Sequence, residues 1–214
     1  MLDTLNQNIQ NYILNAARQE FKIEPDSKLY GWIKYGSGML IINLCNTISL
    51  ILLILAYNFL VNSTSLDLRI LEINYIFTFV FPYALLRAVS FGVHADKIRD
   101  CTLLSMTYFI GGMLIAVNIS IPLWVSILVL LFAGYSFLKY APAETAKRPL
   151  DDNILLFRIL SLLLLLAAII VFIIMRIKQL YIYSNLVLVA MTCQSINLQP
   201  FMYKIFAKNE RIEK

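Results

Sequence analysis

The chain has 214 residues, of which 60% are hydrophobic and only 14% are charged. One soluble domain of this length could not cover so much apolar side chain with polar surface, so we expect an integral membrane protein. The formal net charge of +5 does not indicate nucleic-acid binding, because the basic residues stand in connections and tails. The N-terminus lacks the continuous apolar stretch of a signal peptide.

The first expected element is an amphipathic helix over residues 3–22. Its apolar residues recur at spacings of three and four, which places them on one stripe of a helix. We expect this helix to lie on the membrane surface, with a helix packed on the protein's own core as the alternative. The residues of the stripe are Leu2, Leu5, Ile9, Tyr12, Ile13 and Ala16.

Six apolar stretches follow, each near the roughly 20 residues that are needed to cross a hydrocarbon layer about 30 Å thick. They lie at residues 38–61, 72–89, 102–120, 121–138, 154–175 and 180–203. The predicted fold class is therefore all-α, a polytopic protein with about six transmembrane helices in a single integral membrane domain, residues 1–214. The third and fourth spans require a tight turn between Asn118 and Pro122. Without that turn the chain would have five spans, and the topology after it would be inverted.

The distribution of basic residues predicts the orientation, because Lys and Arg near membrane ends favour the cytoplasm. With the N-terminus inside, 15 of the 18 Lys and Arg residues fall in inner segments, and only Arg69, Arg176 and Lys178 fall outside. An even number of spans returns the C-terminus to the same side. We therefore expect both termini, and the loop from Arg87 to Cys101, to be cytoplasmic.

That loop concentrates most of the reactive side chains and contains the only histidine, His94. Cytoplasmic thiols stay reduced, so Cys101 can act as a nucleophile if His94 removes its proton. Seven residues of straight helix would separate the two by about 10 Å, which is too far for proton transfer. Gly92 allows a bend before His94. Cys101 would then begin the next helix, where free backbone amides stabilise a thiolate.

The other readings of this segment stay open at this point. Cys45 and Cys193 lie in apolar runs, where a thiol behaves as a small hydrophobe. His94 and Cys101 could stand in an ordinary interfacial loop of a non-enzymatic exporter or assembly subunit. A zinc site with Asp96 or Asp100 as extra ligands is a further alternative, although tetrahedral sites usually have more His and Cys. No spaced aspartates indicate a lipid head-group transferase.

Two segments resemble the signature of the accessory gene regulator B family. The first comprises Arg87, the tetrad Gly92-Val93-His94-Ala95, and Cys101 seven residues after the histidine. The second is Tyr140-Ala-Pro-Ala-Glu-Thr-Ala-Lys147-Arg148-Pro149, which is similar to the family's loop between later spans. Many members have a glycine where Phe91 stands, which leaves Gly92 as the one flexible residue of the expected bend.

The resemblance implies a bacterial cell-membrane cysteine endopeptidase that matures a quorum-sensing propeptide. Cys101 and His94 would be catalytic, no cofactor would be needed, and the partner would be a propeptide of the accessory gene regulator D type. A homodimer is the assembly that the resemblance implies. Arg87 would pair with a substrate carboxylate or anchor its helix in the head groups. Lys147 and Arg148 would bind the propeptide tail or set the orientation.

Overall fold

The computed structural model describes residues 8, 11–15, 48–64, 69–93, 98–143 and 154–206. The described part of the chain is helical and has no strand. Helices long and apolar enough to cross a membrane occur at Ile73–Ser90, Asp100–Asn118, Leu123–Tyr140 and Ile154–Ile177, and a shorter apolar helix occurs at Ile48–Ser63. The predicted all-α membrane protein is confirmed.

The helix ends agree with the predicted spans to within a few residues where both can be compared. Helices α3 (Ile73–Ser90) and α7 (Ile154–Ile177) begin within one residue of the expected positions. The tight turn after Asn118 forms, and α6 (Leu123–Tyr140) begins two residues later than predicted. The reason is Pro122, whose extended backbone, with φ −70° and ψ 155°, precedes the first helical residue.

The third span is continuous but not uniform. It consists of α4 (Ile98–Met106), the π-helical turn η1 (Thr107–Gly111) and α5 (Gly112–Asn118). A β-carbon on Gly112 would lie 2.8 Å from the ring of Phe79. The glycine therefore allows α5 to approach α3 closely, next to a π-helical turn of the kind that often marks functional sites.

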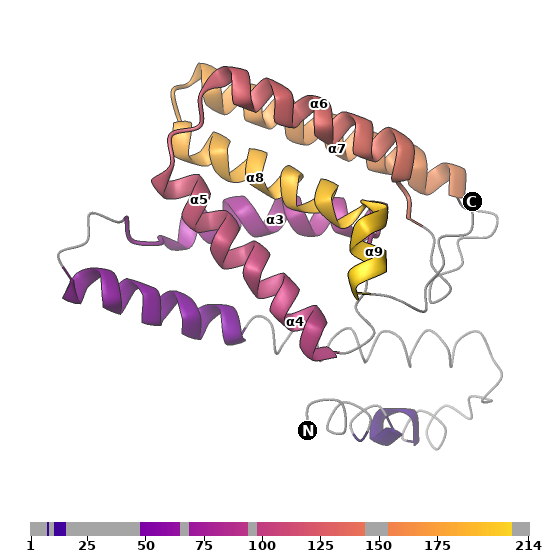
Figure 1. Ribbon diagram of the computed structural model, residues 1–214, viewed down its shortest axis with the longest axis horizontal. Coiled ribbons are helices and arrows are strands. Elements are labelled where there is room, and N and C mark those ends of the chain that lie inside the picture. Colours follow the sequence, from indigo (N-terminus) through magenta and orange to yellow (C-terminus); the bar gives the residue numbers. More distant parts are fainter. Residues whose placement is uncertain are drawn as a thin grey trace.

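Helix α8 (Tyr181–Asn197) lies in the middle of the bundle and packs against α3, α5, α6 and α7 (Figure 1). Two clusters of buried side chains meet on it, one through Leu188 and Met191, the other through Leu186 and Ala190. The predicted span 180–203 is not one helix. It breaks after Asn197, and the short α9 (Pro200–Phe206) begins at a proline, which cannot continue an α-helix from the preceding turn.

The helix Ile48–Ser63 is joined to the bundle by Asn58. The Asn58 side chain donates to the carbonyl of Leu71 at 3.1 Å and accepts from the amide of Leu71 at 2.9 Å. The predicted span 38–61 is described only from residue 48 onwards. Of the predicted amphipathic helix 3–22, residues 11–15 are helical, and most of the remainder lies outside the described residues.

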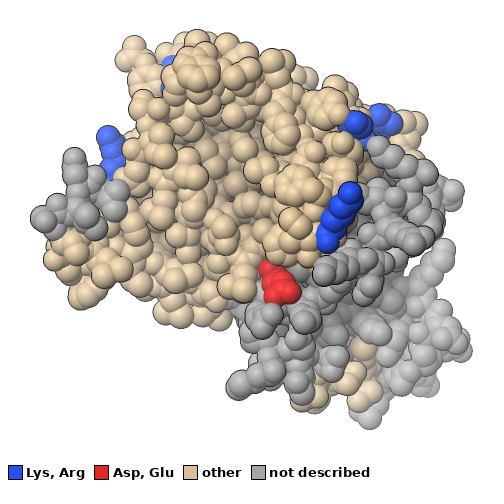
Figure 2. Space-filling view, in the orientation of Figure 1, with Lys and Arg blue, Asp and Glu red and all other residues tan. Residues whose placement is uncertain are grey.

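Large apolar side chains cover the outside of the bundle. Trp124, Leu131 and Leu155 are among those with more than half of their surface exposed. Figure 2 shows a broad uncharged face with Lys and Arg side chains near its margins. Such a surface suits contact with lipid, where charged groups are costly. The cytoplasmic placement of both termini stays a prediction.

Candidate functional site

The segment that the sequence singled out is bent where the bend was expected. Helix α3 ends at Ser90, and α4 begins at Ile98. Between them, Gly92 has a φ of 112°, in the left-handed region that favours glycine. Phe91 also has a positive φ, 59°, which is rare for a bulky residue and costs roughly 1–3 kcal/mol. Gly92 thus bends as expected, and Phe91 shares the bend although it is not a flexible residue.

The described start of this connection, residues 91–93, is named the α3–α4 turn, and the C-terminal end of α8 fixes it. Gln194 donates its side-chain amide to the Ser90 hydroxyl at 2.7 Å and to the Phe91 carbonyl at 2.7 Å. The Val93 amide donates to the backbone carbonyl of Asn197 at 3.2 Å. A strained turn persists only when its surroundings hold it, and these bonds do so.

Arg87 contributes to the same turn from the last turn of α3. Its Nη2 donates to the Val93 carbonyl at 2.5 Å, and its Nη1 is buried without a hydrogen-bond partner in the described part of the chain. A β-carbon on Gly92 would lie 3.1 Å from Nη1 and 3.2 Å from the Asn197 carbonyl. Glycine is thus required both by φ and by space. Sequence reasoning considered anchoring and substrate binding for Arg87 but not this bond.

The second motif segment meets the first in space. The Ala143 amide donates to the Ser90 carbonyl at 3.0 Å, and Phe91 and Ala143 form an isolated parallel bridge. The Phe91 ring also lies 5.2 Å, centroid to centroid, from that of Phe157 on α7. Two segments about 50 residues apart are therefore joined at one place. Lys147 and Arg148 lie outside the described residues.

Cys101 stands in the first turn of α4 as a free, partly buried thiol. The residues before Ile98 lie outside the described part of the chain, so the position of Cys101 at the start of a helix stays a prediction. Cys193 is free and buried in α8 and behaves as part of the core. His94 and Cys45 lie outside the described residues, and the pairing of His94 with Cys101 stays a prediction.

The polar residues at the end of α8 bond to the α3–α4 turn, and sequence reasoning missed them. Gln194 and Asn197 were read only as part of an apolar span. A signal existed, because amide side chains within a membrane span usually face the bundle interior and bond to other helices. Both are almost completely buried, with exposed fractions of 0% and 1%.

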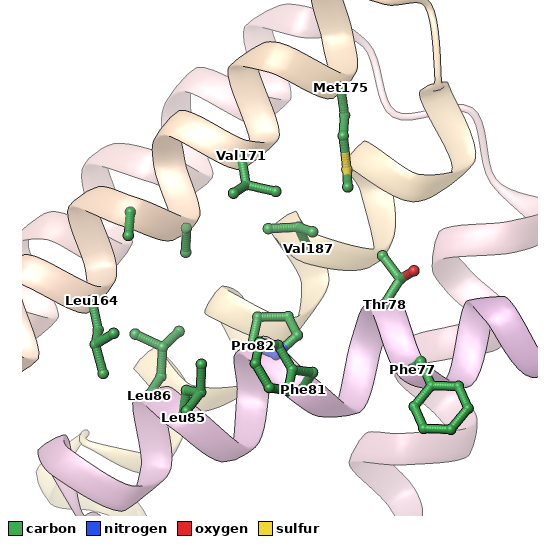
Figure 3. A pocket seen from close by; sticks show the side chains of 12 residues that line it. Phe77, Thr78, Phe81, Pro82, Leu85, Leu86, Leu164, Val171, Met175 and Val187 are labelled. Atoms are coloured by element: carbon green, nitrogen blue, oxygen red, sulfur yellow. The ribbon is translucent and has the colours of Figure 1, made fainter.

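Neither a metal site nor a cavity among the described residues explains the reactive segment. The described residues contain no group of three or more His, Cys, Asp and Glu that could hold a metal ion. His94 and Asp96, on which the zinc alternative depends, lie outside them. A cavity of about 340 Å³ opens between α3 and α7, with Phe81 and Val171 in its walls (Figure 3). Its lining is apolar apart from Thr78 and includes no residue of α4.

Comparison with known proteins decides the family. The family model described as "Accessory gene regulator B" matches residues 6–198. The chain belongs to the accessory gene regulator B family. This match extends across the reactive segment, the second motif segment and the whole of α8, so the bonds described above join parts of one family domain.

Two relatives of this family illustrate the degree of similarity. An AgrB-like protein of Listeria innocua is 28% identical over 127 residues, which are 59% of this chain and 56% of that protein. AgrB-like protein 2 of Clostridium perfringens is 25% identical over 154 residues, which are 69% of this chain and 65% of that protein. The matched region thus spans less than two thirds of either relative. No solved structure matches the chain.

Proposed function

We propose that this member of the accessory gene regulator B family is a membrane cysteine endopeptidase. It would remove the C-terminal tail of a quorum-sensing propeptide at the cytoplasmic face of the bacterial cell membrane and promote cyclisation of the remainder. The observation that carries the proposal is the bend at Phe91 and Gly92. It ends α3 just before His94 in the chain and allows a new helix to begin with Cys101 in its first turn.

A Cys–His pair requires that the chain from His94 to Cys101 does not run as one straight helix. On one straight helix the two residues would stand about 10 Å apart, which excludes direct proton transfer. The proposal therefore includes a non-helical chain between His94 and Ile98, which follows the bend at Phe91 and Gly92. Cys101 also combines a free thiol with partial exposure, and a nucleophile requires both properties.

The reaction would proceed through an acyl-enzyme. His94 accepts the thiol proton, and the Cys101 sulfur attacks the carbonyl carbon of the scissile peptide bond. The carbon–nitrogen bond then breaks, and the leaving amine of the tail takes the proton from His94. A thioester between Cys101 and the propeptide remains. A thiol or hydroxyl of the bound peptide attacks this thioester, which gives a thiolactone or lactone and returns the proton and the free thiol to the enzyme.

Two further features support the proposal. Thioester exchange is close to balanced in free energy, so the cyclisation step requires no nucleotide cofactor. The site adjoins an apolar bundle, and exclusion of water would favour cyclisation over hydrolysis. Lys147 and Arg148, close in sequence to Ala143, are proposed to bind the propeptide tail, and a homodimer is the proposed assembly.

The decisive test replaces the thiol in proteoliposomes that contain the protein and its propeptide. Cys101→Ala should abolish cleavage, because alanine has no nucleophile, and Cys101→Ser should retain less than about one hundredth of the activity. Cys193→Ala is the matched control and should cleave normally, since its thiol is buried in the core. Mass spectrometry of the products, with trapping of a covalent propeptide adduct on Cys101, provides the readout.

Normal cleavage by Cys101→Ala would end the peptidase proposal. The chain would then be better explained as a non-enzymatic exporter or assembly subunit. A second measurement separates these functions without a propeptide. Rapid alkylation of Cys101 by a thiol reagent at neutral pH, lost in His94→Ala, is expected of the enzyme and has no reason to occur in the alternative.

A further inference from the structure

Two amide side chains at the end of α8 are buried inside the helix bundle. There a polar group costs free energy unless it is hydrogen-bonded. Gln194 and Asn197 have exposed fractions of 0% and 1%. Burial of an amide without hydrogen bonds costs more free energy than one typical hydrogen bond contributes. Buried Gln and Asn side chains therefore persist where they have specific hydrogen-bond partners. Their hydrogen-bond partners include the end of α3 and the α3–α4 turn, which come just before His94 in the chain.

Gln194 holds the backbone of α3 where the helix ends. Its amide nitrogen bonds to the Ser90 hydroxyl and to the Phe91 carbonyl, both at 2.7 Å. The Gln194 side chain bonds to that carbonyl at the point where the backbone leaves the helix. The bond therefore stabilises the left-handed conformation with which the bend begins.

Asn197 bonds to the α3–α4 turn through its backbone and to α3 through its side chain. Its backbone carbonyl accepts from the Val93 amide at 3.2 Å, and His94 is the next residue in the chain. Its side-chain nitrogen donates to the Tyr83 hydroxyl at 2.9 Å. Tyr83 is buried, and its ring lies 5.4 Å, centroid to centroid, from that of Phe109 in η1, the turn that follows α4. The side-chain oxygen of Asn197 is buried and has no hydrogen-bond partner in the described part of the chain.

We propose that Gln194 and Asn197 are positioning residues for the peptidase reaction. They fix the position of Val93, the residue before His94, and Asn197 also fixes the Tyr83 hydroxyl. The inference rests on the proposed function. Its physical basis is that a displacement of about 1 Å between reacting groups can lower a rate about 100-fold. The Gln194 side chain opposes such a displacement through its bonds to Ser90 and Phe91. The Asn197 side chain opposes it by joining the end of α8 to Tyr83 of α3, which keeps the Asn197 carbonyl on the Val93 amide.

The same helix contains a matched control. Asn185 is buried, with an exposed fraction of 4%. Its side-chain nitrogen donates to the carbonyls of Ala116 at 3.4 Å and Ile119 at 3.2 Å, and its oxygen also lacks a partner among the described residues. It stands twelve residues before Asn197, about 18 Å away along the helix. Substitution of Asn185 should therefore cost similar stability without reaching the site.

The test compares Asn197→Ala with Asn185→Ala in proteoliposomes with propeptide. Asn197→Ala should lower kcat about 10-fold to 100-fold while KM changes less than about twofold. It should also lower the rate of Cys101 alkylation at neutral pH, with recovery at alkaline pH, in a background that carries Cys45→Ala and Cys193→Ala. Asn185→Ala should leave kcat and alkylation within about twofold of the parent protein. Equal losses in both variants would mean a purely structural role and would overturn the proposal.

A double substitution tests whether Asn197 acts through His94. If it does, Asn197→Ala should have no further effect on alkylation in a protein that already carries His94→Ala. Additive losses would contradict the proposal. If Asn197→Ala does not fold, Tyr83→Phe is the second variant. It removes only the hydroxyl that accepts the Asn197 hydrogen bond, and we expect a severalfold loss of kcat. Unchanged kcat in a folded Tyr83→Phe protein would contradict the role assigned to that bond.

The failure of this inference and that of the proposed function give different results. If His94→Ala leaves both cleavage and Cys101 alkylation unchanged, the peptidase proposal fails. If His94→Ala lowers both while Asn197→Ala resembles Asn185→Ala, the peptidase proposal stands and only the positioning role fails.

Discussion

The turn after α3 and the turn between α5 and α6 are each fixed by an arginine and by an asparagine of α8. At the α3–α4 turn, Arg87 donates to the Val93 carbonyl and Asn197 accepts from the Val93 amide. At residues 119–122, the α5–α6 turn, Arg176 donates to the Ile121 carbonyl at 2.6 Å and Asn185 donates to the Ile119 carbonyl at 3.2 Å.

The two turns differ in their backbones and in the helices to which they lead. Ile119 and Pro122 have ordinary extended conformations, and the next helix presents apolar side chains on its outside. Phe91 and Gly92 have positive φ values, and the next helix contains the proposed nucleophile. An arginine and an asparagine thus stabilise an unstrained turn near one end of α8 and a strained turn near the other end. Strain that the surroundings maintain is a common mark of functional sites.

The largest expected difference between the two turns is the side of the membrane on which each lies. A cysteine at Ser120 in the α5–α6 turn should react with an impermeant maleimide in intact cells, whereas a cysteine at Lys97 should react only after permeabilisation. The reason is the excess of basic residues on the Lys97 side. The experiment uses a background in which all three native cysteines are alanine.

Labelling of Lys97→Cys from outside would contradict the orientation and would remove the cytoplasmic environment assumed for Cys101. Equal labelling of both positions in intact cells would instead mean that the spans between them have been misassigned.

The second prediction concerns the strained backbone. Gly92→Ala should lower propeptide cleavage about 100-fold, because the φ of 112° disfavours a side chain and the new β-carbon would press on Arg87 and the Asn197 carbonyl. Gly134→Ala in α6 is the control, since its β-carbon would meet nothing within 4 Å. It should cleave normally and unfold at the same temperature or slightly higher. Normal cleavage by Gly92→Ala would show that the bend is not needed.

The smallest expected difference is in stability, and it concerns the two arginines. Arg87→Leu and Arg176→Leu should each destabilise the protein by about 1–3 kcal/mol, because each removes a charged hydrogen bond to a turn carbonyl. Thermal unfolding in detergent would measure this. Only Arg87→Leu should also lower cleavage, by about tenfold, since only the α3–α4 turn leads to the site. An equal loss of cleavage in Arg176→Leu would remove the functional distinction between the turns.

Much of the fold could be predicted from the sequence, because apolar length and Pro, Gly and Asn signals directly determine spans and turns. The turn at Asn118–Pro122 and the bend at Gly92 are examples. The break before Pro200 was overlooked within an apolar run. The positive φ of Phe91 was also not predicted, since a bulky residue seldom adopts it and only packing and hydrogen bonds can hold it there.

The sequence by itself determined the all-α membrane class, the approximate spans and the reactive segment with Gly92 and Cys101. Only the tertiary structure decided that α8 is central, that Ala143 joins Phe91, and that Gln194 and Asn197 fix the turn. The physical reason is that lipid tails are as apolar as a protein core, so the hydrophobic pattern of a span does not distinguish a central helix from a peripheral one. Contacts between residues about 50 or 100 positions apart arise only when the helices pack.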